Sequence, residues 1–198
     1  MKELFKKNSI KVLLFLLVCC VLYCNDERKR EKINANEEIS IAKIISKGRR
    51  NRIGYKFQYN GNWVTGSGSG GFNSEVGEYY RVNFDKTNLK NSEIIIREKS
   101  INPMILINNG PEINGIVEKI GYPSKKYLDL YISYEYNKEK YEFRTRKHID
   151  SLSCGTVSDC ENATIKIRIS DYFPELNNLY YESYDRSKLR REIKRKFE

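Results

Sequence analysis

Histidine is almost absent from this chain of 198 residues, in which His148 stands alone. A structural zinc site usually takes four ligands, so a site built on one histidine would need unusual help from carboxylates. His148 lies near Asp150, Ser151 and Cys154, but these residues share one loop and their spacing resembles no known nucleophile–base arrangement. The sequence therefore predicts no catalytic residue, no metal site and no cofactor.

Cysteine is scarce outside the N-terminal segment. Three of the five cysteines lie within the first 24 residues, which leaves Cys154 and Cys160 in the rest of the chain. The five residues between them include Gly155 and Ser158, so the loop could close into a short disulfide in an oxidising compartment. We predict a structural disulfide, with free thiols or metal and redox chemistry as the alternatives.

No apolar run in the sequence reaches the length of a membrane-spanning helix. The run from Val12 to Tyr23 has 12 residues, whereas a spanning helix needs about 20 and the apolar part of a signal peptide has about 7–15. Four lysines precede this run and Cys24 follows it, as in a bacterial lipoprotein signal, although Tyr23 stands where a small residue is usual. We predict a signal peptide or membrane anchor over residues 1–23, with lipid attached to Cys24.

Three forms of this N-terminus remain open: a lipoprotein cleaved before Cys24, an uncleaved anchor, and a soluble exported chain. All three place the folded part outside the cytoplasm, at the bacterial cell envelope. The first two hold the chain at a membrane through a lipid or a helix. Residues 24–38 are polar, mixed in charge and nearly free of apolar side chains, which predicts a flexible tether.

Acidic residues are outnumbered, since 36 Lys and Arg stand against 26 Asp and Glu, for a formal net charge of +10. Such a balance is found in proteins that bind nucleic acid or an anionic membrane surface. Lys, Asn, Ile and Tyr are abundant throughout the chain, as in proteins from AT-rich bacterial genomes. We favour this compositional bias over a nucleic-acid partner.

The C-terminal residues 185–198 are basic and carry apolar side chains at helical spacing. Leu189, Ile193 and Phe197 recur four residues apart among Lys and Arg, which would place them in one stripe of a helix. We predict a short basic amphipathic helix that packs this stripe on the preceding module. Contact with anionic lipid and a frayed tail are the alternatives.

Tyrosine and phenylalanine, by contrast, are plentiful and occur in a pattern that is repeated. Residues 79–96 and 164–181 both alternate apolar and polar side chains, break at a turn and resume. Alternation with a period of two is typical of half-buried strands. We therefore predict an all-β protein with two related small β-barrel-like modules in tandem, over residues 39–98 and 113–184, with a linker over residues 99–112.

The two copies align at offsets that grow along the chain from 73 to 77 to 85 residues, which indicates insertions in the second copy. Representative aligned pairs are Ala42 with Gly115, Phe57 with Tyr134, and Tyr80 with Ile165. The hairpin turn Asn60-Gly61 aligns with Asn137-Lys138, and Asn-Gly favours a two-residue turn because both residues tolerate positive φ. Trp63 aligns with Tyr141 if one turn residue is inserted.

The glycine-rich stretch "GSGSGG" over residues 66–71 superficially suggests a phosphate-binding loop. Such a loop would end in Lys-Ser or Lys-Thr and lead into a helix, whereas a predicted strand follows here. We expect a flexible hairpin loop instead.

The first copy contains "NGNWVTG", "VGEYYRVNF" and "NLKNSEI", and the second contains "GIVEKIG", "YEYNKEKYEF" and "FPELNNL". This pattern resembles a family of uncharacterised bacterial envelope modules, whose consensus has Gly-x-Val, a Tyr-rich hairpin with Gly at its turn, Val-Gly-x-x-Tyr-x-Val-x-Tyr and Asn-Pro-x-x-Ser. Leu89 replaces the usual proline of that consensus. The resemblance covers residues 40–182 and implies a fold, but it carries over no catalytic residue.

Aromatic residues on the predicted strands form a candidate binding surface. Its members are Trp63, Tyr79, Tyr80, Tyr134 and Tyr136. Alternating tyrosines on a strand are more often half-buried sheet residues, and we expect Trp63 in the core rather than against a ligand.

The leading hypothesis for function is a non-enzymatic binding or interaction protein of the cell envelope, with an unidentified protein or glycan as its ligand. The alternative is a structural or protective role, such as an immunity-type lipoprotein that blocks a secreted toxin. An enzyme of unknown class comes third.

Overall fold

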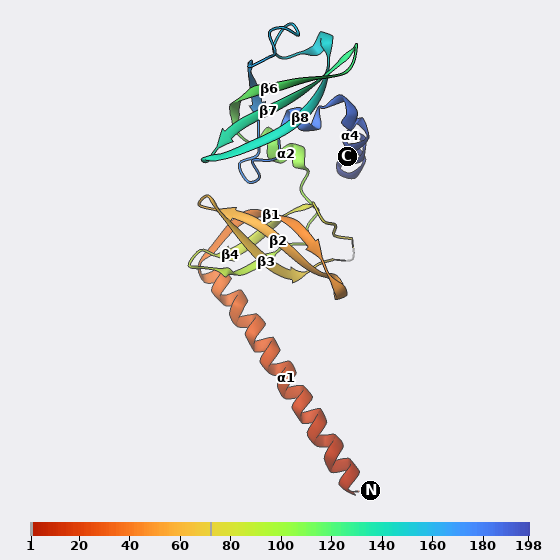
Figure 1. Cartoon of the computed structure of the whole chain (residues 1–198). Helices are drawn as coiled ribbons and strands as arrows, with labels where there is room; N and C mark the ends of the chain where they lie inside the picture. The colour runs from red at the N-terminus through yellow and green to blue at the C-terminus, as the bar shows by residue number, and fades with distance from the viewer. Residues whose placement is uncertain (1, 72) are drawn as a thin grey trace. The chain divides into compact units, whose positions relative to one another are not determined.

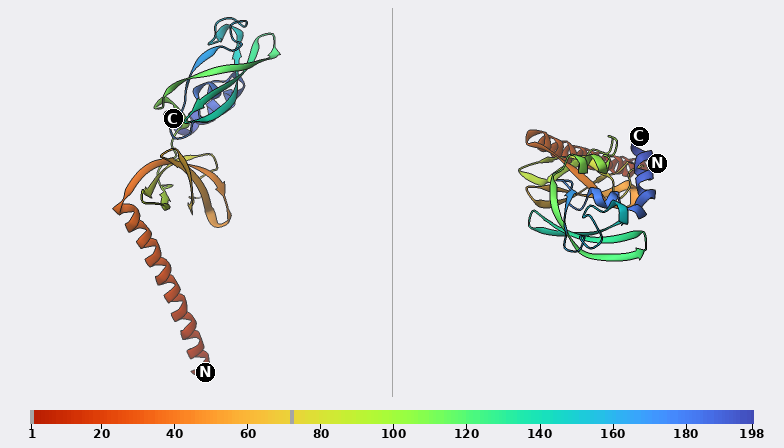
Figure 2. Two further views of the ribbon diagram at one scale, coloured as in Figure 1. Left: turned by 60° about the vertical axis from the view of Figure 1, so that its left-hand side comes forward. Right: turned by 90° about the horizontal axis from the view of Figure 1, so that it is seen from above.

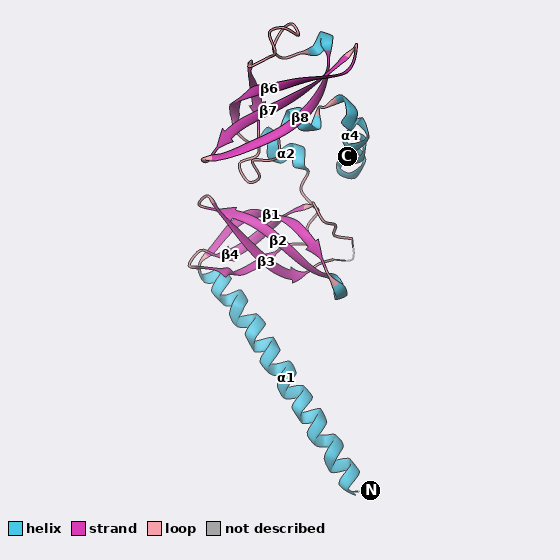
Figure 3. Cartoon of the chain, in the orientation of Figure 1, coloured by secondary structure: helices cyan, strands magenta, loops and turns pink. Residues whose placement is uncertain are grey.

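The structure is a computed structural model that describes residues 2–71 and 73–198. The chain divides into a first compact unit, Met1–Phe57 with Val64–Glu98, and a second, Gln58–Trp63 with Lys99–Glu198. Strands dominate both units (Figure 3), in two separate sheets. The prediction of an all-β protein is therefore confirmed.

The first sheet has five strands in the order β3-β2-β1-β4-β5. Their bounds are β1 Glu37–Lys47, β2 Arg52–Tyr59, β3 Asn62–Ser69, β4 Tyr79–Asp85 and β5 Asn88–Ile94. The strands twist and curl so strongly that the sheet is nearly a barrel (Figures 1 and 2). Alternate residues face its interior, where Ile44, Phe57 and Phe84 are fully buried and the two phenylalanine rings lie 5.0 Å apart.

The second sheet has four strands in the order β8-β7-β6-β9. Their bounds are β6 Glu112–Ser124, β7 Tyr127–Tyr136, β8 Glu139–His148 and β9 Thr164–Arg168. Its core is aliphatic, with Val117, Leu130, Ile132 and Ile167 at most 1% exposed. Burial of each such side chain contributes about 1.5–3 kcal/mol.

Strands β3-β2-β1-β4 of the first sheet and β8-β7-β6-β9 of the second have the same order and the same register. Three pairs of facing residues show this correspondence. Ile44 faces Tyr55 as Val117 faces Ile132, and Ala42 faces Tyr80 as Gly115 faces Ile165. Phe84 faces Ser92 as Ile169 faces Asn177. The register of β1 with β2 shifts between Ile44 and Ser46, and that of β6 with β7 shifts between Val117 and Lys119. We call two residues equivalent when they occupy the same ladder position in the two sheets.

The hairpins after β2 and β7 both turn through two residues in the left-handed region. The φ angles are 48° and 77° at Asn60 and Gly61, and 52° and 66° at Asn137 and Lys138. No residue is inserted in the second turn, so the pairing of Trp63 with Tyr141 was wrong. Counting from the turn makes Lys140 the equivalent of Trp63.

The glycine-rich residues 66–69 lie in β3, so the expectation of a flexible loop there was wrong. The cause is close packing: an added Cβ at Gly66 would lie 2.4 Å from Cε2 of Tyr55, and one at Gly70 would lie 2.5 Å from Cγ2 of Ile53. Glycine is therefore required at Gly66 and Gly70, while Ser67 and Ser69 are exposed.

Helix α1 spans Lys2–Ala35 and contains Cys24, whose side chain is exposed. The structure thus differs from the flexible tether expected over residues 24–38, because the Glu-, Lys- and Arg-rich sequence favours a helix and Ile33 is buried with 3% exposure. Arg30 also lies 3.7 Å from Glu93 of β5. Within the described residues, no helix is both long and apolar enough to cross a membrane.

Short helices occur elsewhere. They are η1 Arg49–Asn51, α2 Pro103–Asn108, η2 Ile149–Ser151, α3 Asn178–Tyr181, η3 Tyr184–Arg186 and α4 Ser187–Phe197. Helix α2 lies in the expected linker, where Asn102 caps it by accepting a hydrogen bond from the Met104 amide at 2.9 Å. Helix α4 lies in the expected C-terminal helix, and its apolar stripe is half-buried.

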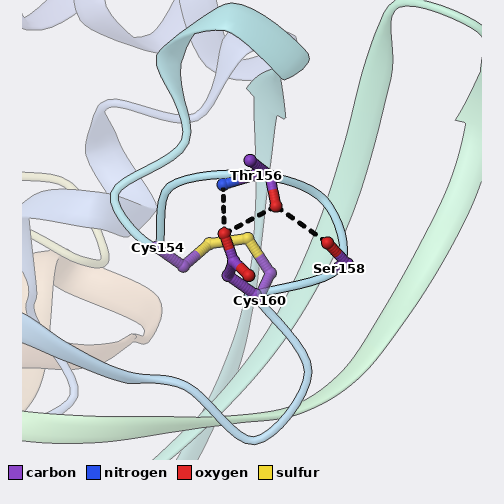
Figure 4. The surroundings of a disulfide bond; sticks show 5 residues. Cys154, Thr156, Ser158 and Cys160 are labelled. Carbon is purple, nitrogen blue, oxygen red and sulfur yellow. Dashed lines mark hydrogen bonds between the residues drawn. A yellow bond between two sulfur atoms is a disulfide. The ribbon is translucent and has the colours of Figure 1, made fainter.

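The disulfide between Cys154 and Cys160 is confirmed, with their Cα atoms 5.0 Å apart (Figure 4). The Asp159 carboxylate accepts hydrogen bonds from the amide and hydroxyl of Thr156 at 3.0 and 2.6 Å, which holds the loop in a tight turn. Cys160 is fully buried, and Val157 packs against the core of the second sheet. The crosslinked loop is thus fastened to that core.

Candidate functional site

The predicted aromatic surface does not form. Tyr79, Tyr80 and Tyr134 are only 4, 5 and 5% exposed, because their strands turn them into packed surfaces. Burial raises the pKa of Tyr134 to about 12, and its hydroxyl donates to the Pro174 carbonyl at 2.5 Å. These three side chains are buried by packing and leave almost no surface for a ligand.

The other two members of that surface are half-buried. Tyr136 donates a hydrogen bond to Asp171 at 2.6 Å, and this bond raises the pKa of Tyr136 to about 12. Trp63 lies in β3 and is half-buried rather than in the core. Neither residue lines any of the hollows described below.

A basic hollow of about 450 Å³ lies on the outside of the first sheet. Its residues come from η1, the start of β2 and the end of β3, and they are Arg49, Arg50, Arg52, Ser67, Gly68 and Ser69. The side chains of its arginines and serines are all exposed. The hollow thus combines three guanidinium groups with two hydroxyls. We call it the arginine hollow.

The backbone at this corner is tightly constrained. Arg50 and Asn51 have φ angles of 57° and 56°, a left-handed conformation that costs a non-glycine residue about 1–2 kcal/mol. The Gly48 amide donates to the Arg52 carbonyl, and the Gly70 amide donates to the Asn51 carbonyl, both at 2.6 Å. These bonds hold the corner against the end of β3.

The described residues place no acidic partner against the charges of the arginine hollow. No ion pair among the described residues involves Arg49, Arg50 or Arg52. Guanidinium groups present their N–H donors in a rigid fork that matches the oxygens of carboxylate or phosphate. The hydroxyls of Ser67 and Ser69 supply further donors. The arrangement suits an oxyanion.

The equivalent positions of the second sheet differ in charge: its strand β7 carries an acid and its strand β8 carries two arginines. Asp129 is equivalent to Arg52, and Arg144 and Arg146 are equivalent to Ser67 and Ser69 by the same count from the turn. Arg146 donates to both Asp129 oxygens at 2.7 and 2.9 Å, and Arg144 lies 3.0 Å from the same carboxylate. The bonds from Arg146 hold the pKa of Asp129 below its ordinary value.

Two other hollows differ from the arginine hollow in charge balance. The outer face of the second sheet has one of about 450 Å³, where Lys140 lies 2.8 Å from Glu142 and 3.8 Å from Glu118. The other, of about 560 Å³, lies along α4 and is lined by Lys188, Arg191, Lys194, Arg195 and Glu198. Each of these two hollows is lined by at least one glutamate, whereas no Asp or Glu is among the lining residues of the arginine hollow.

Sequence reasoning missed the arginine hollow. The three arginines stand within four positions, in "GRRNR", but their separation from "SGS" by fourteen residues hid the meeting of the two segments. Only the return of β3 beside β2 brings them together. Within the part of the chain that the structure describes, no group of three or more His, Cys, Asp or Glu residues is placed to hold a metal ion.

Comparisons with protein-family models, with curated proteins and with solved structures find no match to this chain.

Proposed function

We propose that this protein is a non-enzymatic binding protein of the bacterial cell envelope that binds an anionic ligand in the arginine hollow. The observation that carries the proposal is the set of three guanidinium groups that have no acidic partner among the described residues and are held around a hollow by a constrained backbone. Groups of one charge sign that converge on a hollow raise the local concentration of oppositely charged ligands.

The proposal includes a tandem architecture of two related β-modules. The same order of four strands, matching register and a shift at the same place in both sheets support it. Buried residues also fall on equivalent positions, as with Phe57 and Tyr134, which are 0 and 5% exposed. Under this proposal the two sheets are copies whose outer faces have diverged in charge.

The location rests on the N-terminal sequence, and we propose a lipoprotein attached through Cys24. The short apolar run that ends at this exposed cysteine supports lipid attachment. Metabolic labelling with palmitate should mark the wild-type protein and not a Cys24→Ala variant. Label that persists in the variant would contradict the attachment site.

Ligand binding can be tested with citrate as a trivalent carboxylate probe. A ligand that binds only the folded state raises its stability in proportion to the logarithm of its concentration above Kd. Citrate should therefore raise the melting temperature of the full chain in detergent above that measured in sodium chloride of equal ionic strength.

The matched variants are a hollow variant, Arg49→Gln/Arg50→Gln/Arg52→Gln, and a helix variant, Lys188→Gln/Arg191→Gln/Arg195→Gln. Both remove three exposed positive charges. The citrate effect should disappear in the hollow variant and persist in the helix variant. An equal citrate effect in all three proteins would contradict binding in the hollow.

A further inference from the structure

The outer face of the second sheet already holds a peptide segment at the positions equivalent to the arginine hollow. Residues 183–186 follow α3 and lie against β8. Arg144 donates to the Asp185 carboxylate, and the Arg146 amide donates to the Ser183 hydroxyl oxygen at 2.7 Å. In return, Arg186 donates to the Arg144 carbonyl at 3.2 Å. Both the side chains and the backbone of β8 thus take part in holding this segment.

The electrostatics of this contact favour an ionised carboxylate. Although burial acts to raise it, hydrogen bonds from Ser183 and Arg144 hold the pKa of Asp185 below its ordinary value. Arg144 is shared between Asp185 and Asp129, so each arginine of this face has an acidic or carbonyl partner. The second sheet therefore satisfies its outer arginines with its own chain.

In the first sheet nothing of the described chain takes that place. Ser67 and Ser69 on β3 are exposed, and so is Arg52 beside them. In the second sheet the side chains of Arg144 and Arg146 are only 27 and 28% exposed. The same outer position is thus occupied in one sheet and open in the other.

From this contrast we infer that the ligand of the arginine hollow is an acidic peptide segment of a partner protein, with at least two neighbouring Asp or Glu side chains. The inference rests on the function proposed above and names its ligand class. Two carboxylates are needed because Arg52 replaces the acid Asp129, which leaves the ligand to supply all the negative charge.

A peptide fits better than a lone phosphate or a lipid headgroup for a structural reason. The contact in the second sheet uses a hydroxyl and a guanidinium of the bound segment as well as its carboxylate. A peptide can repeat such bonds along β3, where the hydroxyls of Ser67 and Ser69 are exposed. A lone phosphate or a headgroup has no backbone with which to extend these bonds along the strand.

The experiment measures fluorescence anisotropy of the labelled peptide GSDEDSG with the full chain in detergent. The control peptide GSNQNSG has the same shape without charge. GSDEDSG should bind to the wild type. Its Kd should rise at least about tenfold in the hollow variant, because the loss of even one hydrogen bond to a charged group lowers the binding free energy by about as much as a tenfold change in Kd requires. The helix variant should bind with nearly the wild-type Kd.

A second variant keeps all three arginines and blocks the hollow with a carboxylate of the protein itself. Ser69→Asp places a carboxylate beside Arg52, as Asp129 lies beside Arg146 in the second sheet. This variant should keep or raise the melting temperature and lose binding of GSDEDSG, whereas Ser69→Asn should retain it. Binding that survives Ser69→Asp would overturn the inference.

The outcomes separate this inference from the proposed function. If citrate acts through the hollow but GSDEDSG binds no more tightly than GSNQNSG, the peptide class is wrong and anion binding stands. Binding to phosphatidylglycerol vesicles that is lost in the hollow variant, without binding of GSDEDSG, would likewise overturn the peptide in favour of a lipid headgroup. If neither citrate nor the peptide acts through the hollow, both are wrong.

Discussion

Replacing Gly66 with alanine should destabilise the first sheet, because the added Cβ would lie 2.4 Å from both Cε2 and Cζ of Tyr55. Tyr55 cannot move away easily, since it is fully buried and its hydroxyl lies 3.0 Å from the Ser92 hydroxyl. Overpacking of this kind costs about 1–3 kcal/mol. For a domain of this size, each kcal/mol lowers the melting temperature by about 4–8 °C.

The second sheet shows how the strain could be relieved. Its equivalent residues are Ile132 and Phe143, which face one another across β7 and β8, so the large and small side chains have changed places. Tyr55→Ile alone should cost about 2–5 kcal/mol through lost packing. Gly66→Phe alone should also destabilise the sheet. The double variant Tyr55→Ile/Gly66→Phe should be more stable than the summed effects of Tyr55→Ile and Gly66→Phe predict.

Urea unfolding of the two single variants and the double variant gives the coupling energy directly. Residues in contact show coupling of about 0.5–3 kcal/mol, and compensation is expected here. Ser67→Ala, on the exposed side of the same strand, is the control and should change stability little. Additive effects of Tyr55→Ile and Gly66→Phe would refute the equivalence of these pairs in the two sheets.

Three further predictions concern single features. The folded-state pKa of Asp129 is lowered, so its contribution to the free energy of unfolding should be fully present above its ordinary pKa of 3.8 and vanish as pH falls through the folded-state value. A stability difference between the wild type and Asp129→Asn that grows below pH 3.8 would contradict this. Cleaving the Cys154–Cys160 disulfide should cost about 2 kcal/mol, measured by melting with intact-mass confirmation; two free thiols before reduction would contradict the crosslink. Ile33→Ala should destabilise the first unit by about 2–5 kcal/mol, whereas exposed Val21→Ala should not; equal effects would contradict docking of α1.

The repeating apolar pattern predicted most of the strands because alternation reports which face of a strand is buried. Tyr80 and Phe84 were expected on an alternating strand, and both are buried in β4. The candidate surface was wrong at Tyr79, Tyr80 and Tyr134. Alternation does not say which face of a strand is covered, and here packing covers all three rings.

Features that depend on long-range packing could not be predicted. Glycines in "GSGSGG" indicated a loop by composition, yet Gly66 and Gly68 lie in β3, and at Gly66 the ring of Tyr55 occupies the space of a side chain. Polar residues before Glu37 indicated a tether, yet the burial of Ile33 fastens a helix there. The arginine hollow is also of this kind, since its two segments meet only through the pairing of β2 with β3.

The central claim is that the first sheet binds an acidic segment at the place where the second sheet holds its own residues 183–186. Hydrogen–deuterium exchange of the full chain in detergent, with and without GSDEDSG, tests it most directly. We predict slower exchange over residues 48–54 and 66–71, with no change over β8 and residues 183–186. Protection confined to α4, or no protection in either sheet, would contradict the claim.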